Sequence, residues 1–386
     1  EDERRIPDEY AMLFSGVVDG YVLPGESVSG DVMRRLLPDG VYTWTLRAVA
    51  QDDGEIMEET GTIEIVDADA TLPDITTFEI GPQEFTPNQD GINDRTWINV
   101  FVTKEAELSV YMIGENSDRL FIARREEGRD IGEAGLHAFD YEGGIDIGAD
   151  PPPDGTYTVV AEASDAVGQI VRQSGQLTIR DGGNPRAEII GQPTGVDVVF
   201  EVMPYSDDYF SSADGLGDRV PVPADPDALA QTAISVRQGD LLVFRLTVQN
   251  YGPTPIRTTG PPPGTVYQQT QRAASMGEFD QSGAWRVGID CETEIVDYPW
   301  RWAIGDESNL TDWTDPVTGN TYYYLPPGEQ SVVWGAIRLT EIVDTRNPQD
   351  CWAGLIHEDV AVSLQNSNRG RREVEILPSS TFTADD

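Results

Sequence analysis

The sequence predicts an all-β protein built from tandem β-sandwich domains. Many short segments alternate apolar with polar side chains or are rich in β-branched residues, and turn-forming residues separate them. The 38 glycines and 26 prolines are spread over these turns and do not gather in a linker. Helical periodicity is scarce, and we expect one short helical turn, over Asp225 to Thr232. Short strands at regular turn spacing favour sandwiches.

The segments with the clearest strand pattern run along the whole chain. Each is bounded by clusters of Gly, Pro, Asn or Asp, which end strands. In chain order, we expect strands over Val41–Val49, Thr60–Val66, Trp97–Val102, Glu107–Met112, Thr156–Ala161, Gly175–Ile179, Leu241–Gln249 and Gln330–Leu339.

The charge of the chain excludes several classes of partner. It carries 68 acidic and 26 basic side chains over 386 residues, a net charge of −42, so nucleic acid and anionic membranes repel it. Only Lys104 among the basic residues is lysine; this pattern is typical of a surface adapted to salt or divalent cations, and equally of biased codon usage. We expect no membrane span, since no run of about eighteen apolar residues occurs. The start lacks a signal-peptide pattern, so we expect a mature product.

The sequence contains few side chains suited to catalysis. His137 and His357 are the only histidines, each lies in a strand-like segment, and no nucleophile motif accompanies either. A histidine and thiolate zinc site is equally unsupported. We therefore expect no enzyme. The alternative, a carboxylate-only mechanism such as glycoside hydrolysis, has no carboxylate pair that the sequence singles out.

An internal repeat organises the first half of the chain. Pro38-Asp39-Gly40-Val41-Tyr42 returns as Pro153-Asp154-Gly155-Thr156-Tyr157, about 115 positions later. Gly61-Thr62-Ile63-Glu64-Ile65 returns about 114 positions later as Gly175-Gln176-Leu177-Thr178-Ile179, and one insertion explains the difference. Each copy predicts a strand, a tight turn and a return strand of one sheet.

These motifs resemble a known family. An aromatic residue followed by Thr86 to Asp94, then a Pro-Asp-Gly-Thr-Tyr segment with a trailing Gly, is similar to the Ig-like domain of flagellar hook-capping proteins. That domain recurs in large bacterial cell-surface and secreted proteins, including those of gliding motility. The resemblance implies an Ig-like domain over 73–182 and a partial one over 1–72. As the module serves as spacer, cap or anchor, it implies fold more than function.

Residues 183–386 predict a larger domain. The segment Val236 to Gly252, with Leu325 to Gln330 before another strand, resembles adhesion-type Ig-like domains. We expect long loops at Pro204 to Asp227 and at Gly283 to Tyr322. Cys291 and Cys351 predict one disulfide outside the cytoplasm, against the alternative of two buried free thiols.

The loop Asn88-Gln89-Asp90-Gly91-Ile92-Asn93-Asp94 has the chemistry of a calcium site. Oxygen-bearing side chains stand at alternate positions around a glycine that permits a tight turn. We expect calcium at Asn88, Asp90, Ile92 and Asp94, although the distal bidentate glutamate of an EF-hand is lacking. The alternative is an Asx turn that caps a strand.

Two further features predict surface chemistry in the last domain. A strand at Tyr298-Pro299-Trp300-Arg301-Trp302 places Tyr298, Trp300 and Trp302 on one face, as a sugar-stacking platform or protein interface; the alternative is a domain core. The sequon Asn309-Leu310-Thr311 lies in a polar turn, where Asn309 is open to glycosylation.

The first repeat lacks the counterparts of about three strands of the second. Its strand Val41–Val49 places Tyr42, Trp44 and Leu46 on one face that needs an opposing apolar sheet. Either the missing part was removed, or residues 1–30 replace it, or another chain supplies the strands. The third explanation is β-augmentation, which gives an open filament when repeated head to tail. Arg372 to Leu377 is one candidate donor strand.

The sequence therefore predicts a non-catalytic extracellular structural protein of the cell surface. We expect a subunit of a filament, sheath or layer that associates with itself through Ig-like domains and strand complementation. The alternative is an adhesin, or a carbohydrate-binding accessory segment of a larger secreted protein, with surface glycans as partners.

Overall fold

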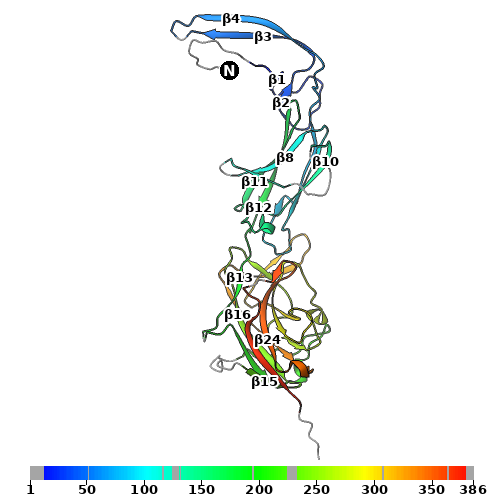
Figure 1. The fold of residues 1–386 in the computed structure, drawn as a ribbon, viewed down its shortest axis with the longest axis vertical. Helices are drawn as coiled ribbons and strands as arrows, with labels where there is room; N and C mark the ends of the chain where they lie inside the picture. Colours follow the sequence, from blue (N-terminus) through cyan, green and yellow to red (C-terminus); the bar gives the residue numbers. More distant parts are fainter. Residues whose placement is uncertain are drawn as a thin grey trace, which may run out of the picture. The chain divides into compact units, whose positions relative to one another are not determined.

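A computed structural model describes residues 13–379 apart from 51, 115–116, 124–129, 131, 194, 224–232, 307 and 363–364. Within these residues the chain is built of β-strands and short 3-10 turns, so the all-β prediction is confirmed (Figure 1). It forms two compact units. Unit 1 comprises 1–85, 95–141 and 154–179, and unit 2 comprises 86–94, 142–153 and 180–386.

Unit 1 contains a two-layer β-sandwich. One layer runs in the order β1-β2-β12-β11-β8-β9, with β6 beside β12, and the other in the order β10-β7-β5. The strands are β1 (Val17–Asp19), β2 (Asp31–Leu36), β5 (Ile75–Gly81), β6 (Glu84–Phe85), β7 (Thr96–Val102), β8 (Glu107–Ile113), β9 (Arg119–Phe121), β10 (Gly135–Tyr141), β11 (Gly155–Ser164) and β12 (Ile170–Ile179).

The core of unit 1 lies between these two layers. Alternate residues of β7 are buried, as the sequence pattern predicts for a strand with one face inward. They pack against the inward residues of β11 and β12. The central contacts come from Ile98, Val100, Val102, Val159, Ala161, Leu177 and Ile179.

A separate two-stranded sheet belongs to unit 1. It consists of β3 (Gly40–Val49) and β4 (Ile56–Ile65), drawn in blue in Figure 1, which pair antiparallel along their whole length. Among the residues that the structure describes, neither strand pairs with any other. By contrast, the preceding strands β1 and β2 join the sandwich, since Val32 of β2 pairs with Val171 of β12.

Unit 2 is a larger sandwich. Its five-stranded sheet runs β13-β16-β23-β18, with β14 also on β16. Its nine-stranded sheet runs β15-β26-β24-β19-β17-β22-β21, with β20 on β19 and β25 on β24. The strands are β13 (Ala187–Ile190), β14 (Val198–Met203), β15 (Ala233–Arg237), β16 (Leu241–Asn250), β17 (Ile256–Thr258), β18 (Val266–Gln268), β19 (Trp285–Cys291), β20 (Trp300–Ala303), β21 (Thr311–Thr314), β22 (Thr321–Leu325), β23 (Gln330–Arg338), β24 (Gln349–His357), β25 (Ala361–Val362) and β26 (Arg369–Leu377).

The described residues of unit 2 also form the 3-10 turns η1 (Ile145–Ile147), η2 (Asp207–Tyr209), η4 (Ala273–Met276) and η5 (Asp344–Arg346). The helical turn expected over Asp225 to Thr232 lies outside the described residues.

The strand predictions hold for every segment named above, with ends that differ by a few residues. The expectation of one long loop after residue 282 is wrong. Gly283 to Tyr322 contains β19, β20, β21 and the start of β22, and every residue of β19 is buried. A strand buried on both faces lacks a regular polar alternation, so its sequence pattern does not distinguish it from a loop.

The expected domain boundaries at residues 72 and 182 also differ from the division into compact units. Residues 1–72 share unit 1 with most of 73–182, whereas Thr86 to Asp94 and residues 142–153 belong to unit 2. Packing between segments far apart in the sequence decides to which unit a segment belongs. The composition along the chain gives no sign of this packing.

Candidate functional site

The hairpin β3–β4 and the hairpin β11–β12 share one pairing register. Gly40 pairs with Ile65 in the first and Gly155 with Ile179 in the second, at the positions that the internal repeat aligns. Arg47 faces Glu58, and at the equivalent pair the charges are exchanged, with Glu162 facing Arg172. The repeat seen in the sequence is therefore a repeat of the folded hairpin.

Equivalent faces of the two hairpins have different surroundings. In the second hairpin, Val159 and Ala161 are wholly buried beneath the β10-β7-β5 sheet. Their counterparts Trp44 and Leu46 are 41% and 44% exposed. Tyr42, on the same face of β3, is half-buried, and Met57 of β4 is exposed. Apart from Glu59, which lies opposite Leu46, this hairpin face is mostly apolar, and within the described residues no sheet covers it.

Trp44 partly covers its own hairpin. A Cβ added to Gly61, directly across from Trp44, would lie 2.5 Å from the indole Cζ2. At the equivalent Gly175, the nearest atom to an added Cβ is Cδ1 of Ile80, at 2.9 Å, from the opposing sheet. The indole thus occupies the space that an opposing strand fills in the second copy.

The loop Asn88–Asp94 is organised by its own side-chain oxygens. Asn88 Oδ1 accepts a hydrogen bond from the Asp90 N–H at 3.1 Å, and Asp90 Oδ1 accepts one from the Ile92 N–H at 2.8 Å. Asp94 Oδ2 accepts one from the Gly91 N–H at 2.7 Å. The first two are Asx-turn bonds, in which a side chain accepts from the N–H two residues further on, and the third ties the end of the loop back to its glycine. The described residues contain no group of three acidic, histidine or cysteine side chains suited to a metal. Calcium at Asn88, Asp90, Ile92 and Asp94 stays a prediction.

The same loop lies against the sheet of unit 2. Tyr324 donates its hydroxyl proton to Asp90 Oδ2 at 2.9 Å, and Arg257 Nε donates to the Asp90 carbonyl at 2.6 Å. The ring Nε2 of His357 lies 2.7 Å from the carbonyl oxygen of Gln89. Three strands, β22, β17 and β24, therefore hold the loop.

Burial at this contact shifts two pKa values in opposite directions. Loss of hydration, with the nearby Asp94 carboxylate, raises the pKa of Asp90 to about 7. Loss of hydration lowers the pKa of His357 to about 4. Both groups are held in their neutral forms over a wide range of pH. The role of His357 is structural, since its ring also stacks on Trp285 at 4.4 Å between centroids.

The aromatic row of unit 2 is a core and not a binding platform. Trp300 and Trp302 are wholly buried and Tyr298 nearly so. The Trp302 ring packs on Phe244 at 4.7 Å and on Tyr267 at 4.8 Å between centroids. The expectation that Tyr298, Trp300 and Trp302 bind a partner is therefore wrong, because both faces of this segment are covered and alternation alone does not reveal the second cover.

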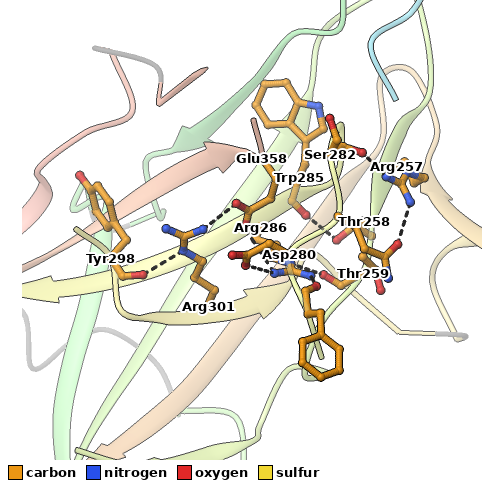
Figure 2. A network of polar contacts seen from close by, with 12 residues as sticks. Arg257, Thr258, Thr259, Asp280, Ser282, Trp285, Arg286, Tyr298, Arg301 and Glu358 are labelled. Carbon is orange, nitrogen blue, oxygen red and sulfur yellow. Dashed lines mark hydrogen bonds and ion pairs between the residues drawn. The ribbon is translucent and has the colours of Figure 1, made fainter. Parts of the chain in front are cut away.

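A buried ionic network lies beside this core (Figure 2). Arg286 is wholly buried, and its Nη1 lies 3.3 Å from Glu358 Oε1 and 3.3 Å from Asp280 Oδ1. Its Nε donates to the Thr259 carbonyl at 2.8 Å. Arg301 Nη1 lies 2.6 Å from the other oxygen of Glu358. Each carboxylate oxygen of Glu358 thus faces a guanidinium, which is typical of a structural network.

The disulfide prediction is confirmed. Cys291 of β19 and Cys351 of β24 are directly opposite and bonded, and both are buried. Asn309 lies in an exposed turn, where its Nδ2 donates to Ser331 Oγ at 2.8 Å. Its glycosylation stays a prediction. His137 is buried in β10, with its Nε2 lying 2.8 Å from the Glu133 carbonyl oxygen.

The proposed donor strand is already in use. Residues Arg372 to Leu377 form most of β26, which pairs with β15 on one side and β24 on the other. This segment therefore cannot complete a hairpin elsewhere without leaving its own sheet. The described residues contain no helix with the length and hydropathy that a bilayer crossing requires.

Comparison with known proteins finds only distant structural similarities. No family model matches the chain, and no curated protein matches its sequence. Among solved structures, the FN1-FN3 domains of chicken CNTN1 align over 83% of this chain and 73% of theirs, at 10% identity and TM-score 0.26. A chimeric titin Z1Z2-Z1Z2 tandem aligns over 80% of this chain and 100% of its own, at 11% identity and TM-score 0.16.

The native conformation of E. coli alpha-2-macroglobulin aligns over 87% of this chain and 19% of its own, at 11% identity and TM-score 0.19. Structural similarities with TM-scores this low give no information about the function of this chain. The assignment of the fold as tandem β-sandwiches rests on the strand order and the cores described above.

Proposed function

We propose that this chain is a non-catalytic extracellular structural protein, a subunit of a cell-surface filament, sheath or layer. In this proposal a second copy of the chain covers the open face of the β3–β4 hairpin. The observation that carries the proposal is the shared register of two hairpins of which, among the residues that the structure describes, only β11–β12 has an opposing sheet.

The repeat supports a sheet as the partner of that face. The equivalent face of β11–β12 is covered by three strands with inward Ile, Val and Phe side chains. Covering Trp44, Leu46 and Met57 in the same way removes apolar area from water, at about 25 cal/mol per Å2. The outer edges of β3 and β4, which pair with no other strand in the described part of the chain, add backbone donors and acceptors for further pairing.

Composition and covalent structure support an extracellular place. The disulfide is typical of oxidising compartments. A net charge of −42 keeps separate copies apart at low ionic strength and allows contact once salt screens it. If one surface of each copy covers the hairpin of the next copy, the repeated contact gives an open polymer.

Self-association of matched hairpin variants tests the proposal. Leu46→Ser makes the open face polar, whereas Val41→Ser changes the opposite face of the same strand at a residue that is even more exposed. In sedimentation velocity at high salt, we expect the wild-type chain and Val41→Ser to associate and Leu46→Ser to remain monomeric. A wild-type chain that is monomeric at every salt and protein concentration contradicts the proposal.

A further inference from the structure

The outer face of the β10-β7-β5 sheet carries a second group of exposed aromatic side chains. On β7, the outward residues are Trp97, Asn99 and Phe101, of which Trp97 is 42% exposed. Their neighbours across the sheet are Asp140 and Gly81 beside Trp97, Ala138 and Glu79 beside Asn99, and Leu136 and Thr77 beside Phe101. Along the strands, the row with Trp97 is therefore followed by a polar row with Asn99 and then by an apolar row with Phe101.

Trp97 lies over a glycine. A Cβ added to Gly81 would lie 2.3 Å from the indole Cζ2 and 2.6 Å from Cε2. Only a residue without a side chain lets the indole lie over the neighbouring strand at this point. One side of the ring thus rests on β5 and is held there, while the other side faces solvent.

Charged and polar side chains share the face of the sheet that carries the ring. Arg95 and Asp140 form an ion pair beside it, with Nη2 to Oδ2 at 2.7 Å and Nε to Oδ2 at 3.1 Å. Both side chains are partly exposed, so two charged groups lie on the same face of the sheet as the ring. In the next row, Asn99 adds an amide and Glu79 a carboxylate.

We propose that this face binds a neutral polysaccharide, with the C–H face of one pyranose ring on Trp97. The sugar hydroxyls then exchange hydrogen bonds with Asp140 and Arg95, and those of an adjoining residue with Asn99. A pyranose with equatorial substituents presents apolar C–H groups above and below its ring and hydroxyls around its edge. That matches a flat aromatic ring with donors and acceptors at its rim.

The same arrangement disfavours a protein partner. Protein interface cores are depleted of charged residues, whereas Asp140, Arg95 and Glu79 lie within this face. The carboxylates and the net charge of −42 also repel acidic polymers, which leaves an uncharged glycan. This site is independent of the proposed assembly, because it lies on the sandwich and not on the β3–β4 hairpin.

Binding to insoluble cellulose and chitin tests the proposal, with alginate as the acidic control. The variants are Trp97→Ala and, as a matched control, Trp313→Ala, since Trp313 is also 42% exposed but lies in unit 2. We expect the wild-type chain and Trp313→Ala to bind one of the two neutral polymers alike and alginate not at all. Trp97→Ala should lose about tenfold or more in affinity.

A second variant guards against a folding defect in Trp97→Ala. Asn99→Ala leaves the indole in place and removes one hydrogen-bonding partner, so it should weaken binding severalfold with an unchanged melting transition. Failure of the wild-type chain to bind either neutral polymer overturns the proposal, as does equal loss in Trp313→Ala. If Trp97→Ala instead reduces self-association in sedimentation while no glycan binds, the face is a contact between copies and the glycan proposal is wrong.

Discussion

Tyr324 and Asp90, which are far apart in the sequence, are joined by a hydrogen bond of 2.9 Å from the phenol to the carboxyl group. The bond fixes the Asn88–Asp94 loop to β22, and Asp90 is 5% exposed there. A carboxyl group in this position costs free energy when it ionises, because it loses water and faces the Asp94 carboxylate. The stability of unit 2 should therefore depend on pH through this loop.

The first prediction concerns stability as the pH rises. The pKa of Asp90 is raised from 3.8 to about 7 in the folded chain, so the folded state holds this proton more tightly than the unfolded state. Its contribution is complete below pH 3.8 and is lost as the pH rises through about 7, at roughly 1.4 kcal/mol for each unit of pKa difference. Thermal unfolding from pH 5 to 8 should show a falling melting temperature for unit 2. Asp90→Asn should flatten this slope, and an unchanged slope contradicts the assignment.

The second prediction concerns the acid side. The pKa of His357 is lowered from 6.5 to about 4, so its contribution is complete above pH 6.5 and is lost as the pH falls through about 4. His357→Gln cannot titrate, and the difference in unfolding free energy between wild type and variant should therefore shrink between pH 6.5 and 4. Denaturant unfolding at closely spaced pH values measures this difference. A difference that stays constant shows that the ring does not titrate in this range.

The third prediction concerns calcium at the loop. Its carboxylates now accept backbone N–H bonds, so calcium binding must replace these bonds and also displace the proton from Asp90. Any calcium-induced rise in melting temperature should therefore be larger at pH 8 than at pH 5. Calorimetry with calcium and with a chelator measures this rise, and Asp94→Ala is the variant that should abolish it. Identical melting with calcium and with chelator at pH 8 assigns the loop to Asx turns alone.

The fourth prediction concerns the disulfide. Cys291 and Cys351 are separated by 60 residues, and closing a loop of this size stabilises the folded state by about 4 kcal/mol in the chain-entropy estimate. The double variant Cys291→Ala with Cys351→Ala should lower the unfolding free energy of unit 2 by about that amount and leave unit 1 unchanged. Non-reducing peptide mapping checks the bond itself, since the two cysteine peptides should appear linked. Free thiols in the native chain refute it.

The fifth prediction concerns salt. At about 0.01 M ionic strength the Debye length is about 30 Å, so the like charges of two copies repel over a long distance. Dilution of salt should dissociate the assembled protein, and restoring salt should reverse this. Light scattering during dialysis follows both steps. An assembly that is indifferent to salt has dry apolar interfaces that charge does not control.

The sequence predicts most of what is local in this fold. Segments such as Thr156–Ala161 alternate because one face is buried, and a repeat of sequence motifs becomes a repeat of pairing register between Gly40–Ile65 and Gly155–Ile179. The disulfide joins the two cysteines that the sequence offers, as predicted. The strands and the repeat depend on residues that are neighbours in the chain, and the disulfide depends on the presence of two cysteines. Both kinds of information are present in the sequence.

Features that depend on distant segments could not be predicted. Nothing near Asp90 indicates that Tyr324 and Arg257 will meet it, and nothing in β2 shows that it pairs with β12. Trp300 and Trp302 alternate as a surface row would, but a second layer covers them. Trp97 was missed as a surface residue, although it stands at an outward position in an alternating strand, which was a usable signal.

The central claim is that another copy covers the β3–β4 hairpin and pairs with its outer edges, and hydrogen exchange of the hairpin's backbone amides tests this most directly. In an antiparallel pair, alternate amides point to the outer edges, where the described residues offer them no strand partner. Exchange is compared between the associated protein at high salt and the dissociated chain at low salt, with β11 and β12 as the internal reference. Completion by another copy predicts that amides of Gly40–Val49 and Ile56–Ile65 become slower to exchange on association while those of the reference stay the same. Unchanged exchange in both hairpin strands, with protection gained elsewhere, contradicts the claim.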